Sequence, residues 1–418
     1  MSNPTPPPVV NASWNGATAD WNTPSDWLDD IVPNNANTDV TLGGSGAYTV
    51  TIGQGESFSV GTVLLDDPAA IFSIAGTLAT AALTVDAGTL ALSPGATIYG
   101  STQGGGAGSA LELMAGAGPG VLNALGTKFT NFATVTVESG ATWTVDALAS
   151  ALSGVAITGS GGSNELVITS SGAADLSQVG GFPTIDLAAG NNTVTLADAT
   201  LSGGAVIIRA GGFGNNSVGA SGDTAASTGK TLTYVAGTGT DSFTGGFEND
   251  VVKVSAVAVG GDTLTGGSGT NTLVLTSAGT ANLDGVSNFQ TIDLAAGGNT
   301  VTLGNGNIAV FTGAGGTDLL YFGAASGPTS DLMTIGSGAQ ATLFDQSTGS
   351  AGLNIDTVMG FSEASGDRIS FDGSSSPSAV ASVIAHTTQD SAGNVQIHIA
   401  NSVITLAGVH NITASFFA

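Results

Sequence analysis

A nine-residue pattern, G-G-x-G-x-D-x-U-x with U an apolar residue, recurs in the middle of the chain and carries its clearest chemistry. The best copies stand in tandem: residues 236–244 place Asp241 at the sixth position, and residues 245–253 place Asp250 there. Glycine alone takes positive φ without strain, so the first six residues predict a sharp turn. Such a turn points backbone carbonyls inward beside the Asp carboxylate, and Ca²⁺ prefers oxygen ligands of this kind.

Further copies are less regular. They are residues 211–219 with Asn216 at the sixth position, 257–265 with Asp262, 266–274 with Asn271, and 313–321 with Asp318. Glu248 takes a glycine position, and a neutral Asn would bind Ca²⁺ more weakly than Asp. Any of these side chains could instead satisfy the backbone of its own turn. The predicted metal ligands in these turns are Asp241, Asp250, Asp262, Asp318, Gly237, Gly239, Gly246, Gly260 and Asn271.

The elements that position these ligands are short strands. The last three residues of each nonapeptide make a minimal strand whose U side chain enters the core, so nine residues give half a coil and two nonapeptides complete one. Residues 60–150 also consist of short apolar runs broken by Gly, Asp or Pro, without helical periodicity. We therefore expect strands of three to five residues stacked in a solenoid.

An internal duplication supports this architecture. Three blocks of sequence occur twice, each pair offset by the same 107 residues: 159–167 with 266–274, 184–190 with 291–297, and 192–196 with 299–303. One shared offset predicts a stretch of coils repeated along a solenoid.

Composition excludes several classes of function. The chain has 5 Lys and Arg against 31 Asp and Glu, a net charge of −26, and no Cys. So few basic residues cannot neutralise a phosphate backbone, which excludes nucleic-acid binding. No apolar run approaches the roughly 20 residues of a transmembrane helix, so no membrane insertion is expected. The excess of acid favours a solution cation, Ca²⁺, as the partner.

The sequence offers little for catalysis. No His precedes residue 386, and no H-E-x-x-H motif occurs. Paired carboxylates for glycoside hydrolysis remain open, because 31 acids allow many pairs. We expect no enzyme; the alternative is a polysaccharide-binding or polysaccharide-cleaving β-helix protein, such as a lyase, epimerase or glycosidase.

Residues 159–330 resemble the RTX, or haemolysin-type, calcium-binding repeat proteins that Gram-negative bacteria export by type I secretion. The tandem at 236–253 carries the resemblance most specifically. The resemblance implies an extracellular β-roll that folds when it meets Ca²⁺ outside the cell. Residues 354–361 and 366–369 are similar to the segment that closes such proteins, where Asp356 and Asp367 would complete a last ion site or cap turns.

Both ends of the chain predict capping modules. Trp14, Trp21 and Trp27 indicate a packed end-cap or, alternatively, a sugar-stacking platform. Near the other end, residues 378–388 and 395–399 predict a β-hairpin around a turn at 390–394. The apolar tail is similar to type I secretion signals.

The expected fold is an all-β, right-handed parallel β-solenoid or β-roll with an N-terminal cap and a C-terminal β-hairpin region. The expected parts are a flexible Pro-rich leader (1–10), a Trp-containing cap (11–60), a short-strand solenoid (61–157), an RTX-like β-roll (158–345) and a C-terminal cap with the secretion signal (346–418). The expected function is that of a secreted Ca²⁺-binding structural protein of the cell surface or matrix. Its expected partners are further copies of itself, cell-surface polysaccharide and the type I secretion machinery.

Overall fold

The fold is a parallel β-solenoid of about 13 turns in which strand accounts for 50% of the residues, as the sequence predicts. The computed structural model describes residues 10–302, 309–312, 315–322, 332–336, 340–345, 354–371, 376–399 and 402–417. The predicted leader lies outside the described residues except for Val10. The chain forms two compact units, Met1–Ala188 with Asn192–Val206, and Ala189–Asn191 with Ile207–Ala418.

The first unit is built almost entirely of strands, with two 3-10 turns, η1 (Pro24–Asp26) and η2 (Ala149–Ala151). The strands are β1 (Val10–Ser13), β2 (Ala19–Asp20), β3 (Thr38–Leu42), β4 (Tyr48–Ile52), β5 (Ser57–Ser59), β6 (Thr62–Ile74), β7 (Thr77–Leu92), β8 (Thr97–Leu113), β9 (Gly120–Leu125), β10 (Phe129–Val137), β11 (Trp143–Ala147), β12 (Ala156–Thr158), β13 (Glu165–Ile168), β14 (Gly172–Asp175), β15 (Val179–Gly180), β16 (Thr184–Asp186) and β17 (Asn192–Ala197).

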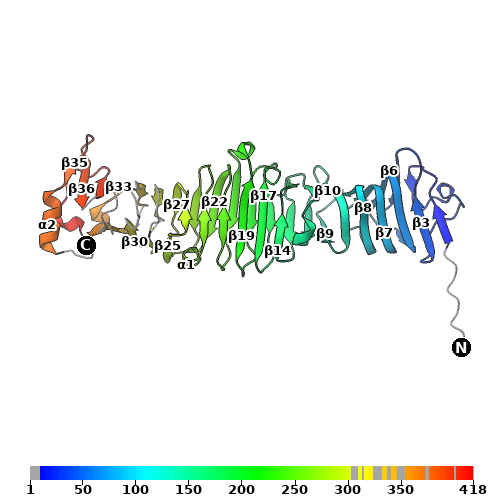
Figure 1. The fold of residues 1–418 in the computed structure, drawn as a ribbon, viewed down its shortest axis with the longest axis horizontal. Helices are drawn as coiled ribbons and strands as arrows, with labels where there is room; N and C mark the ends of the chain where they lie inside the picture. The colour runs from blue at the N-terminus through cyan, green and yellow to red at the C-terminus, as the bar shows by residue number, and fades with distance from the viewer. Residues whose placement is uncertain are drawn as a thin grey trace, which may run out of the picture. The chain divides into compact units, whose positions relative to one another are not determined.

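Three of these strands are much longer than the sequence suggests. β6, β7 and β8 contain 13, 16 and 17 residues and pair in parallel side by side (Figure 1). The expectation of three to five residues is wrong here because the strands continue through the corners. Gly88 and Gly100 take φ of 103° and 106° inside β7 and β8, and the register shifts at neighbouring positions, which lets the strands bend.

The three Trp residues form the core of the N-terminal cap. Trp27 packs edge-on against both Trp14 and Trp21, with ring centroids 4.8 Å apart in each pair. The indole N–H of Trp27 donates to the Trp21 carbonyl at 2.8 Å, and that of Trp21 donates to the Pro33 carbonyl at 3.1 Å. All three are at most 2% exposed, so they form a packed end-cap and offer no open ring face for sugar stacking.

The second unit continues the pattern with shorter strands. They are β18 (Val206–Arg209), β19 (Asn216–Gly222), β20 (Thr231–Val235), β21 (Ser242–Thr244), β22 (Asn249–Val254), β23 (Thr263–Thr265), β24 (Thr272–Leu275), β25 (Thr280–Asn282), β26 (Val286–Ser287), β27 (Thr291–Asp293), β28 (Thr300–Thr302), β29 (Ala309–Phe311), β30 (Thr317–Phe322), β31 (Leu332–Thr334), β32 (Gln340–Asp345), β33 (Asn354–Met359), β34 (Arg368–Phe371), β35 (Thr388–Gln389), β36 (Val395–Ile399) and β37 (Ser402–Leu406). Helices are few: α1 (Ala256–Val259), α2 (Pro377–Ala385), η3 (Ala225–Ser227), η4 (Glu363–Ser365) and η5 (Ala414–Phe416).

The predicted inward-facing residue of each nonapeptide does enter the core. Val252, Leu273, Ile292 and Val310 pair across parallel strands on successive coils, and each is 0% exposed. Thr and Asn occupy many of the alternating outward positions. The core of the second unit therefore contains stacked apolar side chains from both sheets, such as Val252 on β22 and Phe243 on β21.

The coil is longer than two nonapeptides. Asp241 bonds to Asp262 on the next coil, 21 residues later, so the expected repeat of 18 residues is wrong at this point. The extra residues lie at α1, where Ser255 caps a single helical turn that ends at Gly260. The two halves of the coil still alternate between two sheets, because β21 pairs with β23 and β22 pairs with β24.

The duplicated sequence blocks adopt equivalent structure. β13 in the first copy corresponds to β24 in the second, and β16 corresponds to β27, at the same offset. The Asn192 amide donates to the carbonyl of Ala188 at 2.8 Å, and the Asn299 amide donates to that of Ala295 at 2.9 Å. The duplication is therefore a repeated stretch of coils, as predicted.

The C-terminal cap differs in part from the expected hairpin. The strand expected at 378–388 is wrong for most of its length, because residues 377–385 form α2, beside β35 and β36 in Figure 1. Pro377 occupies the first turn and the Ser376 hydroxyl accepts from the Ala379 N–H at 3.3 Å, a helix start that overrides strand propensity. The turn at 390–394 does join antiparallel strands, β35 and β36, and β36 pairs with β37.

In the described part of the chain, no helix is long and apolar enough to cross a membrane.

Candidate cation-binding turns

The first corner, defined as Asn216, Asp241 and Asp262, stacks the sixth positions of successive coils. The three side chains are only 2%, 1% and 4% exposed. The backbone N–H of Asn216 donates to Asp241 Oδ1 at 2.8 Å, and that of Asp241 donates to Asp262 Oδ1 at 2.7 Å. Gly237 N–H donates to Asp241 Oδ2 at 2.8 Å. Both oxygens of Asp241 therefore accept hydrogen bonds, whereas Asp262 Oδ2 has no donor.

The second corner, defined as Asp250, Asn271 and Gln290, repeats the arrangement beside β22, β24 and β27. Asp250 N–H donates to Asn271 Oδ1 at 2.9 Å, and Asn271 N–H donates to Gln290 Oε1 at 2.6 Å. Gly267 N–H donates to Asp250 Oδ2 at 3.2 Å, which leaves Asp250 Oδ1 buried without a donor. The two nonapeptides of the tandem therefore supply one carboxylate to each corner.

Asp318 lies in β30 and stacks on Asn299 of the preceding coil. Asn299 donates to Asp318 Oδ1 from its backbone N–H at 2.9 Å and from its side-chain amide at 2.8 Å. Asp318 is 0% exposed, and its Oδ2 has no donor. It resembles Asp262 in keeping one carboxylate oxygen uncommitted.

The structure places the two predicted closing carboxylates in different sheets. Asp356 is buried in β33, which pairs with β37, whereas Asp367 precedes β34, which pairs with β32. Asp367 accepts from the Ala341 N–H at 2.9 Å and from the Ser362 N–H at 2.7 Å, one bond to each oxygen. Asp367 therefore holds a turn together through the backbone.

Two of the four predicted turn glycines, Gly237 and Gly239, lie close to the backbone of the preceding coil. None lies in the left-handed region, so the expectation of positive φ is wrong for Gly237, Gly239, Gly246 and Gly260. A Cβ on Gly239 would overlap the carbonyl oxygen of Gly214 on the preceding coil. Gly260 ends α1 with φ of −67°. Gly239 is required because bare backbones meet there, which the nonapeptide pattern alone does not reveal.

Burial dominates the electrostatics of these turns. It raises the pKa of Asp262 to about 6, with a further contribution from the negative charge of Asp241. Burial also raises the pKa of Asp250, and the charge of Glu248 adds to that rise. It raises the pKa of Asp318 as well, although hydrogen bonds from Asn299 partly offset the rise. The fold therefore disfavours the charged form of all three carboxyl groups unless a cation accompanies it.

Ca²⁺ suits the donor chemistry at Asp250, Asp262 and Asp318. Each offers a buried carboxylate oxygen without a hydrogen-bond donor, in a turn that also contains backbone carbonyls. Among the residues that the structure describes, no three His, Cys, Asp or Glu side chains are grouped to hold a metal ion. An ion at these turns would thus depend on carbonyl oxygens and water in addition to one or two carboxylates.

Sequence reasoning missed the fifth position of the nonapeptide. Asn215 Oδ1 accepts from the Thr240 N–H of the following coil at 2.9 Å, and Asn249 Oδ1 accepts from the Thr270 N–H at the same distance. At the sixth position, the backbone N–H of one coil donates to the side chain of the following coil. At the fifth position, the N–H of the following coil donates to the side chain of the preceding one, so hydrogen bonds link the coils in both directions. The signal was available as Asn at the fifth position of two adjacent coils. Gln290 carried no such signal.

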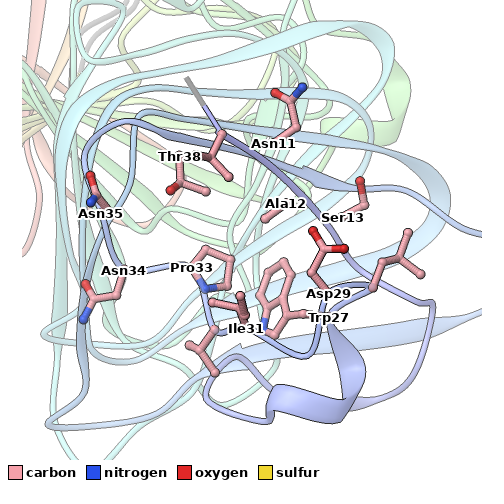
Figure 2. Close-up of a pocket in the computed structure, with 13 residues that line it drawn as sticks. Asn11, Ala12, Ser13, Trp27, Asp29, Ile31, Pro33, Asn34, Asn35 and Thr38 are labelled. Carbon is pink, nitrogen blue, oxygen red and sulfur yellow. The ribbon is translucent and has the colours of Figure 1, made fainter. Parts of the chain in front are cut away.

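The N-terminal cap holds a separate cavity of about 290 Å³, shown in Figure 2. β1 forms one wall, and the loop from Trp27 to Asn35 forms the other. The loop wall carries the carboxylate of Asp29 and the amides of Asn34 and Asn35. Trp27 also borders the cavity, but its side chain is only 2% exposed.

No protein-family model matches this chain, and no curated protein and no solved structure shows significant similarity to it.

Proposed function

We propose that this chain is a secreted, calcium-binding structural protein of the RTX repeat type, located at the surface or in the extracellular matrix of a Gram-negative bacterium. The observation that carries the proposal is the set of buried carboxylate oxygens without donors at Asp250, Asp262 and Asp318. A buried unpaired charge is strongly destabilising. A cation taken from solution would remove that cost and couple folding to Ca²⁺.

The hydrogen bonds of each residue indicate which role we propose for it. Asp250, Asp262 and Asp318 would bind the ion through their uncommitted oxygens, and Ca²⁺ when bound would neutralise stacked negative charge. Asp241 and Asp367 use both oxygens on backbone N–H groups, so their role in this proposal is to set the turn geometry. The chain would remain poorly folded where Ca²⁺ is scarce and fold after export.

The charge of the chain supports a role in assembly. With a net charge of −26, copies repel one another unless cations screen or bridge their acidic faces. Surface-layer subunit, biofilm matrix component and adhesin are the roles we propose, with type I secretion as the export route and cell-surface polysaccharide as a further partner.

A Ca²⁺ titration with EGTA reversal tests the proposal. Circular dichroism and light scattering are recorded on the same sample, with Mg²⁺ as the control ion. β-structure and large assemblies that form with Ca²⁺ and disappear with EGTA support the proposal. A protein that is folded and monomeric without Ca²⁺, and unchanged by it, contradicts the proposal and leads to a screen for polysaccharide binding and cleavage.

A further inference from the structure

Glu248 interrupts the glycine pattern of the tandem repeat at a buried position. It stands at the fourth position of the copy at 245–253, between β21 and β22, and it is 0% exposed. The Gly246 N–H donates to its Oε1 at 3.3 Å, a long hydrogen bond. Its Oε2 is buried without a donor.

Asp250 presents its carboxyl group to that of Glu248. One oxygen of Asp250 accepts from Gly267 N–H, and the other, Oδ1, has no donor. Burial raises the pKa of Asp250, and the charge of the neighbouring Glu248 carboxyl group raises it further. Two buried carboxylates, each with one uncommitted oxygen, therefore belong to a single turn.

A third carboxylate approaches from the preceding coil. A Cβ on Gly246 would lie 2.6 Å from Glu248 Oε2 and 2.7 Å from Asp223 Oδ2, so both oxygens border the same small space. Asp223 is 8% exposed and follows β19. Negative charge thus gathers around Gly246 from two coils.

Packing alone does not require a charged side chain at position 248. A neutral Gln at 248 would fill the same volume and could donate to Asp250, whereas Glu adds a buried charge next to another. Two facing carboxylates are stable only with a shared proton or a cation between them. An oxygen-only site with two carboxylates and backbone carbonyls favours a hard divalent ion.

We propose that Glu248 and Asp250 together form a divalent-cation site that differs from the other turns. In this site, the side chain at the fourth position of the repeat binds the ion directly. The inference rests on the proposed function in taking Ca²⁺ as the ion, and it adds a ligand that the glycine pattern does not supply. Asp223 lies beside the site and is not required as a ligand. With Glu248 added, the turn of Asp250 offers two carboxylates to one ion.

Isothermal titration calorimetry and native mass spectrometry with CaCl₂ test the inference on the full chain. Glu248→Gln keeps the volume of the side chain and removes its charge, and Glu112→Gln, on an outward-facing position of β8, is the matched control. We expect Glu248→Gln to lose the tightest-bound ion or to bind it at least roughly tenfold more weakly. We expect Glu112→Gln to bind Ca²⁺ as the wild type does.

Glu248→Gly provides a second test, because it restores the glycine of the repeat. If Glu248 merely degraded the motif, this variant would bind Ca²⁺ more tightly than the wild type. The inference predicts weaker binding, with a metal-free melting temperature at least as high as that of the wild type, because a buried charge has been removed.

The outcomes separate the two proposals. Wild-type stoichiometry and affinity in both Glu248 variants overturn the inference and leave the proposed function standing. A wild-type chain that binds no Ca²⁺ at all overturns both.

Discussion

The metal-free protein should become more stable as the pH falls from neutral toward 5, which is the reverse of ordinary acid denaturation. The perturbation is protonation of the buried carboxyl groups of the turns. Asp262 has a pKa of about 6 in the fold, against 3.8 in the unfolded chain. Because the folded-state pKa is raised, its contribution to stability is fully present below pH 3.8 and is lost as the pH rises through about 6.

The magnitude follows from the size of the shift. A difference of about two pKa units corresponds to about 3 kcal/mol over the whole range, of which roughly 2 kcal/mol is recovered between about pH 7.5 and pH 4.5. Asp250 and Asp318 are shifted in the same direction and add to the trend. Burial also raises the pKa of Asp146. The lowered pKa values of Asp175 and Asp390, which accept hydrogen bonds from Ser177 and Asn394 in their own turns, oppose the trend.

The assay is urea unfolding of chelator-treated protein at a series of pH values, followed by circular dichroism. Asp262→Asn is the matched variant, and it should flatten the slope by about 2 kcal/mol between the two ends of the series. Saturating Ca²⁺ should reverse the wild-type trend, because protons then compete with the ion. A metal-free wild type whose stability falls steadily from pH 7.5 to 4.5 would refute the reasoning.

Three further outcomes are expected. Asp250→Ala should weaken Ca²⁺ binding at least roughly tenfold, whereas Asp293→Ala, on the outward face of β27, should leave it unchanged; equal effects in calorimetry would contradict the site. Gly239→Ala should destabilise the fold by roughly 1–3 kcal/mol or more through overlap with the neighbouring coil, and a melting temperature equal to that of the wild type would show that the coils can separate. Trp21→Ala should cost about 3–5 kcal/mol in the first unit, measured by thermal unfolding, and a cost under about 1 kcal/mol would mean that the cap is dispensable.

Much of the fold can be predicted from the period of the sequence. The U residue of some nonapeptides stands between two polar neighbours, so Phe243 and Leu264 are assigned to the core without any structure. The constant offset of the duplicated blocks likewise predicts equivalent coils. Both signals are local or strictly periodic, which is why sequence reasoning captures them.

The features that could not be predicted from the sequence depend on contacts between neighbouring coils. The role of Gly239 is set by a carbonyl oxygen on the preceding coil, and the extra residues at α1 are invisible until two corners are aligned. Sequence alone also ranks Asp241, which lies in the regular tandem, above Asp262 as a ligand. Only the hydrogen bonds show that one has both oxygens committed and the other does not.

The variable spacing between stacked corner residues makes the path between corners a natural place to lengthen the chain. Asn216 and Asp241 are 25 residues apart, Asp241 and Asp262 are 21 apart, and yet the bonds between their positions are alike. The longer interval includes the turn at η3, between β19 and β20. The shorter interval passes through α1, where Val257 is 83% exposed. A peptide tag or a small folded module inserted at that point should be displayed on the side of the solenoid while the stacking of the corners is preserved.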